Sequence, residues 1–121
     1  MIMKKIKLVI GWLMGVILIL GAVGHINSPE VSSGFIPDFL PKQLVHIAAA
    51  IVEAALGIGV FIKPYRKKAL YGIFILMILF LPLHVIDLFR ETPIIGSQTA
   101  AIIRVLIHFV FIFLAWFSNK E

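Results

Sequence analysis

Long apolar stretches alternate with short polar segments along this chain. Four stretches approach the length at which an α-helix crosses the hydrocarbon core of a membrane, which is about 30 Å thick. They lie at residues 8–23, 44–62, 69–89 and 100–117. With their helix ends included, the predicted spans are about 5–26, 42–62, 68–89 and 98–118. Because short segments join them, consecutive helices should run antiparallel. We therefore predict an all-α integral membrane protein, an antiparallel four-helix bundle, with residues 1–121 as a single membrane domain.

Proline, glycine and serine positions add detail to these helices. Pro82 lies inside the third stretch, where a missing N–H should kink the helix just before His84. Gly11 and Gly15 have the spacing of a close helix contact, which we expect to be made with the chain's own helices. Ser97 precedes the fourth stretch and is the predicted N-cap of that helix. The segment 27–41 is rich in proline and apolar residues, so we interpret it as an interfacial turn or lid over one end of the bundle.

The composition supports a membrane location. The chain is 61% hydrophobic with a mean hydropathy of +1.09, more apolar than a small soluble domain could bury. It contains no cysteine, which excludes disulfides and thiolate metal sites. A net charge of +5 could suit nucleic acid, but the basic residues gather on one side of the predicted bundle. They are Lys4, Lys5, Lys7, Lys63, Arg66, Lys67, Lys68 and Lys120.

The other two loops carry only Lys42 and Arg90 as basic residues. Positive charge concentrates in cytoplasmic loops, so both termini should be cytoplasmic. The expected location is the bacterial inner membrane, and the expected partner is the lipid bilayer rather than nucleic acid. The first stretch also resembles a signal peptide, but it is longer than a usual signal core and we expect it to be retained.

Ionisable residues interrupt the apolar stretches at similar depths. They are His25, His46, Glu53, His84, Asp87, Arg104 and His108. A helix rises about 1.5 Å per residue, which places all of them in the outward half of the membrane. Helical spacing puts His46 and Glu53 on one face, and it pairs Arg104 with His108. Ionisable groups in a membrane are costly, so this cluster is the candidate ligand-binding site.

Several interpretations of the cluster remain open. Arg104 should face a carboxylate, either Glu53 or Asp87, whereas His108 has no acid near it in sequence. The cluster could be a polar core that fixes how the helices pack. It could also bind a small apolar molecule such as a quinone, whose carbonyl oxygens accept hydrogen bonds from histidine or arginine. A haem or metal site and a proton pathway are further alternatives, with haem less expected than quinone. We assign no metal ligand and no catalytic residue.

Several short motifs follow one another in a specific order. In chain order they are Gly24-His25, Phe35-Ile36-Pro37-Asp38-Phe39-Leu40-Pro41, Glu53 four residues before Gly57, Pro64-Tyr65-Arg66, Leu81-Pro82-Leu83-His84, and Arg104-Val105-Leu106-Ile107-His108. This order resembles the DoxX-like family of small bacterial membrane proteins. The resemblance extends from His25 to Trp116, and only the ordered combination is specific. The chain departs from the family pattern with His84 where asparagine is frequent, Leu106 where proline is usual, and His108 where glutamine is usual.

The resemblance implies a four-helix bundle and a link to membrane redox chemistry. It carries over His25, Glu53, His84 and Arg104 as the polar set. The wider group includes the membrane subunit of thiosulfate:quinone oxidoreductase, and more distant relatives with the same four-helix plan include an animal chaperone of nicotinic acetylcholine receptors. We therefore expect an outward-facing pocket for a quinone or similar redox ligand, in an enzyme or subunit with a membrane redox partner or as a homo-oligomer. The alternative is a non-enzymatic chaperone or structural subunit of a membrane complex.

Overall fold

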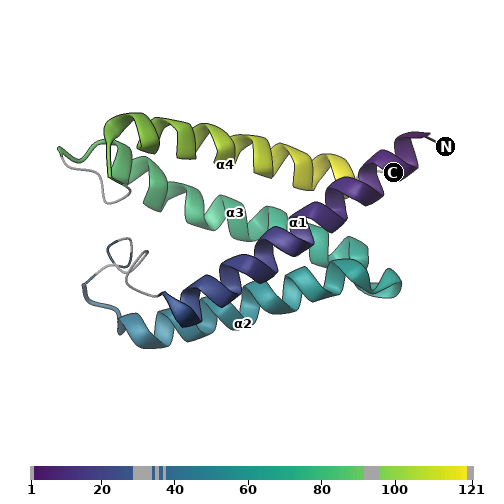
Figure 1. The fold of residues 1–121 in the computed structure, drawn as a ribbon, viewed down its shortest axis with the longest axis horizontal. Coiled ribbons are helices and arrows are strands. Elements are labelled where there is room, and N and C mark those ends of the chain that lie inside the picture. Colours follow the sequence, from purple (N-terminus) through teal and green to yellow (C-terminus); the bar gives the residue numbers. More distant parts are fainter. Residues whose placement is uncertain (1, 29–33, 35, 37, 92–95, 120–121) are drawn as a thin grey trace.

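The fold of this computed structural model is entirely helical over the residues described, which are 2–28, 34, 36, 38–91 and 96–119. These residues form four α-helices and one 3-10 turn, with no β-strand among them. In chain order the elements are α1 (Ile2–Asn27), α2 (Lys42–Phe61), η3 (Lys63–Tyr65), α3 (Arg66–Leu88) and α4 (Gln98–Asn119) (Figure 1). Each α-helix, α3 taken together with η3, is long and apolar enough to cross a membrane, which confirms that part of the prediction.

Local sequence signals explain several helix ends. The Ala100 N–H donates to Ser97 Oγ at 3.1 Å, so Ser97 caps α4 as predicted. Pro41 is the N-cap residue of α2, which begins at Lys42. Pro82 lies inside α3, which continues to Leu88, so the proline does not end the helix. The kink expected there stays a prediction.

Some sequence predictions concern residues outside the part of the chain that the structure describes. They include Pro29, Phe35 and Pro37 of the predicted lid, and Lys120. Within the lid segment, Ile36 is described and is buried. The Lys42 Nζ donates to the Ile36 carbonyl at 3.0 Å, which ties this residue to the start of α2. The lid as a whole stays a prediction.

The helices associate mainly as two pairs, α1 with α2 and α3 with α4 (Figure 1). Contacts between α2 and α3 and between α1 and α4 join the two pairs. The start of α1 and the end of α4 lie side by side. Lys7 Nζ of α1 is 5.1 Å from the centroid of the Phe117 ring of α4. We refer to the opposite end, where α1 ends and α4 begins, as the His25 end.

The buried interior has an apolar part and a polar part. The apolar core consists of Met14, Leu18, Val60, Ala69, Leu70, Ile73, Met77 and Ala115. The buried polar residues are His46, Glu53, His84, Asp87 and His108, which lie nearer the His25 end. Apolar packing therefore holds the helices together at one end. Most of the polar groups lie between the apolar core and the His25 end of the bundle. This position agrees with the similar membrane depth predicted for them.

Large apolar side chains also cover the outside of the helices. Leu13 on α1, Ile51 on α2, Leu79 on α3 and Phe109 on α4 are all more than half exposed. An exterior of this kind is unfavourable in water and suits contact with lipid hydrocarbon.

The backbones of α1 and α2 approach closely where two glycines face each other. A Cβ added at Gly15 would lie 2.9 Å from the Gly57 carbonyl oxygen, and one at Gly57 would lie 2.7 Å from the Gly15 carbonyl oxygen. Backbone atoms cannot move aside as a flexible side chain can. Gly15 thus packs against the chain's own α2, as its spacing with Gly11 predicted.

We expect Gly15→Ala to lower the free energy of unfolding by about 1–3 kcal/mol, because the added methyl group overpacks the α1–α2 contact. Gly24→Ala is the matched control in the same helix, since a Cβ there has nothing within 4 Å. Unfolding of the purified variants in mixed detergent micelles, followed by circular dichroism, measures the difference. Equal stability of the two variants would contradict the close contact.

Candidate functional site

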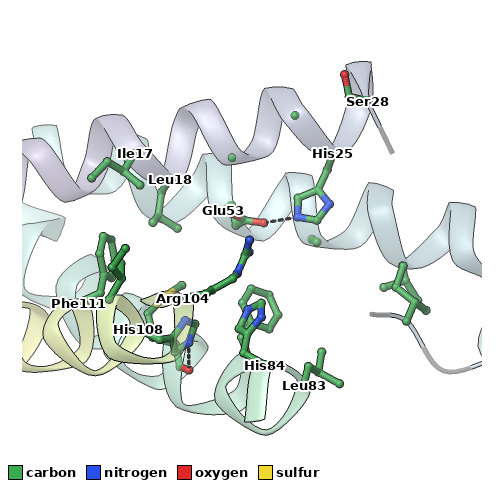
Figure 2. A pocket seen from close by; sticks show the side chains of 18 of the residues that line it. Ile17, Leu18, His25, Ser28, Glu53, Leu83, His84, Arg104, His108 and Phe111 are labelled. Carbon is green, nitrogen blue, oxygen red and sulfur yellow. Dashed lines mark hydrogen bonds and ion pairs between the residues drawn. The ribbon is translucent and has the colours of Figure 1, made fainter. Parts of the chain in front are cut away.

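A cavity of about 770 Å³ lies among the four helices toward the His25 end (Figure 2). Five ionisable side chains line it, and they come from all four helices: His25, Glu53, His84, Arg104 and His108. Apart from Ser28, the rest of the wall consists of apolar residues and glycine. A cavity of this size, with apolar walls and a few convergent polar groups, is typical of a small-molecule site.

The α1–α2 side of the cavity holds a row of three ionisable residues. His25 Nε2 lies 2.8 Å from Glu53 Oε2, and His25 Nδ1 lies 3.0 Å from His46 Nδ1. Glu53 and His46 are buried, and they lie on the same face of α2 as their seven-residue spacing predicted. Gly21 makes room for the carboxyl group, because a Cβ there would be 2.7 Å from Glu53 Oε1.

The α3–α4 side holds a second pair of histidines. The ring centroids of His84 and His108 are 4.9 Å apart. His108 is held by the backbone of the neighbouring helix, because its Nε2 lies 2.6 Å from the Met77 carbonyl oxygen. A carbonyl only accepts, so His108 Nε2 carries the proton and donates it.

Arg104 extends from α4 into the cavity, and its guanidinium points toward Glu53 (Figure 2). The Asp87 carboxylate is also close enough to act electrostatically on Arg104. Of the two acids that the sequence offered as its partner, Asp87 therefore acts on Arg104. The negative charge of Asp87 offsets part of the cost of placing a guanidinium at membrane depth.

Residues 14–119 match a protein family described as a domain of unknown function, DUF8561. The chain belongs to this family. Every residue that lines the cavity falls within the matched region. No curated protein and no solved structure matches the chain.

The two remaining predicted site residues of this DUF8561 protein lie beside the cavity. His46 is buried against His25, and its ring centroid is 5.2 Å from that of His25. Asp87 is 2% exposed, and its Oδ1 lies 3.5 Å from Arg90 Nε. Neither lines the cavity, but each acts on a residue that does.

Sequence reasoning missed several parts of the cavity wall. Gly21 and Gly24 from α1, and Ile36 from the segment before α2, all line it. The role of Gly21 could have been predicted only if the sequence had shown that this glycine faces Glu53. The Met77 carbonyl that binds His108 left no sequence signal, because every residue has a backbone carbonyl.

The histidines of this DUF8561 protein do not converge as metal ligands do. The described residues contain no group of three or more histidine, aspartate and glutamate side chains that could hold a metal ion. In each histidine pair the rings are adjacent and tilted, with centroids 4.9 Å or 5.2 Å apart. The two rings within each pair are therefore too close for a haem to lie between them. The arrangement instead suits hydrogen bonding and proton exchange with a molecule in the cavity.

Proposed function

We propose that this protein is a DoxX-like protein of the bacterial inner membrane whose cavity binds a quinone or a similar apolar redox molecule. The observation that carries the proposal is the convergence of His25, Glu53, His84, Arg104 and His108 in an otherwise apolar cavity. A quinone has an apolar body and carbonyl oxygens that accept hydrogen bonds. The cavity offers both kinds of surface.

The proposed topology is an antiparallel four-helix bundle with both termini in the cytoplasm. The contact between Lys7 and Phe117 supports termini on one side of the membrane. At the His25 end, Lys42 Nζ lies 3.6 Å from Asp38, and Arg90 pairs with Asp87. Among the described residues, this end has fewer Lys and Arg residues than the opposite end, which favours an outward orientation of the cavity.

The apolar wall suits a ligand that comes from the bilayer. Ile17 on α1 and Ile103 and Ile107 on α4 line the cavity, and each is about half exposed. An isoprenoid tail could lie along these side chains while the polar head reaches Arg104. In this arrangement the apolar tail would stay out of water, between these side chains and the surrounding lipid.

Reduction of a quinone to a quinol takes up two electrons and two protons. Glu53 and the histidines are groups that can donate those protons. The electrons would come from a membrane redox partner, which makes the protein a subunit or an enzyme that works with such a partner.

The test is to purify the protein in mild detergent, extract it with organic solvent and measure the quinones released by chromatography. We expect retained quinone, and less of it in Glu53→Gln. If the ligand is lost during purification, a titration with a short-chain quinone still measures whether the protein binds quinone. Protein that retains no quinone, does not bind the short-chain form, and keeps its stability in Glu53→Gln would favour the alternative of a structural subunit or chaperone.

A further inference from the structure

We infer that Glu53, His25 and His46 form a proton relay between the cavity and the start of α2. Glu53 lines the cavity, the ring of His25 lies between Glu53 and His46, and His46 lies behind it in the first turns of α2. The relay depends only on these three side chains. It would deliver protons to a quinone, but it does not require that a quinone be the ligand.

Both ring nitrogens of His25 are engaged. Its Nε2 is 2.8 Å from Glu53 Oε2, and its Nδ1 is 3.0 Å from His46 Nδ1. A neutral imidazole accepts a hydrogen bond at one nitrogen and donates from the other. It can therefore take up a proton on one side and release one on the other.

The contact between the two histidines couples their protonation. At 3.0 Å, one Nδ1 must donate and the other must accept, since two facing N–H groups would repel each other. The tautomer of His25 therefore fixes which nitrogen of His46 carries a proton. Burial of His46 and Glu53 limits competition from water for these hydrogen bonds.

The row has two self-consistent states. When Glu53 is protonated, its O–H donates to His25 Nε2, His25 Nδ1–H donates to His46 Nδ1, and the His46 proton is on Nε2. When Glu53 is ionised, His25 Nε2–H donates to the carboxylate and His46 Nδ1–H donates to His25 Nδ1. Going from the first state to the second shifts one proton along each contact and releases one from His46 Nε2 to an outside acceptor. Glu53 has then lost one proton and both histidines remain neutral.

The surroundings place charge at the cavity end of the row. The Arg104 guanidinium from α4 points toward Glu53 (Figure 2), and α3 and α4 add His84 and His108 to the same cavity. Lys42 lies one turn before His46 and is bonded to Ile36 and Asp38.

The second histidine pair differs in a way that supports this assignment. His108 donates its Nε2 proton to the Met77 carbonyl oxygen, which does not accept a proton at ordinary pH. That hydrogen bond fixes one tautomer of neutral His108. In the row from Glu53 to His46, both measured contacts join ionisable side chains.

Solid-state NMR of protein in lipid bilayers tests the relay, with ¹⁵N-labelled histidine rings and ¹³C-labelled glutamate carboxyl groups. Nitrogen shifts distinguish a protonated ring nitrogen from an unprotonated one. Across a pH series we expect His25 and His46 to exchange tautomers in the same pH interval in which the Glu53 carboxyl titrates. His108 should retain its Nε2 proton through that interval. In Glu53→Gln, both tautomer changes should disappear, because glutamine places a polar group of similar size beside His25 but does not titrate.

Independent titration of the two rings, or tautomers that stay constant while Glu53 titrates, would overturn the relay. The wild-type series gives this answer by itself if the variant does not fold. No quinone is needed in the sample, so failure of the relay is distinguishable from failure of quinone binding.

Discussion

Arg104→Leu is expected to weaken binding of a short-chain quinone by about 10- to 150-fold. A hydrogen bond to a charged group contributes about 1.5–3 kcal/mol, which corresponds to that range of Kd. Arg104 is the permanently charged donor that lines the cavity among the described residues, and its guanidinium points into the cavity (Figure 2). Leucine keeps the apolar bulk near the backbone but offers no donor to a carbonyl oxygen.

The matched control for Arg104→Leu is Lys68→Leu, which also replaces one positive charge by leucine. Lys68 is exposed in the first turn of α3 and does not line the cavity. Quinone titration of both proteins in detergent gives the two Kd values, and thermal unfolding shows whether each is folded. Leucine also leaves Asp87 without the Arg104 guanidinium, so some loss of stability is expected in the first variant alone. Equal Kd values for the two variants would show that Arg104 does not contribute to quinone binding.

The helices could be predicted from the sequence because their signals are local. Length, hydropathy and a cap such as Ser97 depend on neighbouring residues, and the structure has the four apolar helices and the cap that they indicated. The shared face of His46 and Glu53 followed from the helical repeat in the same way. The division of the interior into a polar part and an apolar part could also be predicted, because it follows from where the ionisable residues lie along each helix.

Contacts between helices were less accessible to sequence reasoning. The helical repeat gives the face on which a residue lies, but not the direction in which that face turns. His25 could thus be placed at the end of α1, whereas its contacts with both His46 and Glu53 depend on how α1 rotates against α2. His108 had no partner in sequence because its partner is the backbone of Met77, 31 residues away.

Gly24→Phe is expected to block quinone binding without destabilising the fold. Gly24 lines the cavity, and a Cβ built there has no atom within 4 Å. A phenyl ring at this position therefore has space available, and it would occupy part of the volume that the ligand needs. Glycine inside a helix costs about 1 kcal/mol relative to better helix formers, so the free energy of unfolding should stay the same or rise.

Leu20→Phe is the matched control for Gly24→Phe, because Leu20 lies one turn earlier on α1, is 64% exposed and does not line the cavity. Quinone titration and thermal unfolding are measured for both. Arg104→Leu tests the polar contact and Gly24→Phe tests the empty volume, so together they separate two ways in which binding could fail. Binding that depends on Arg104 but tolerates phenylalanine at position 24 would place the ligand in a part of the cavity away from Gly24. Loss of binding in both variants, with Leu20→Phe unaffected, requires that the ligand lies inside the cavity.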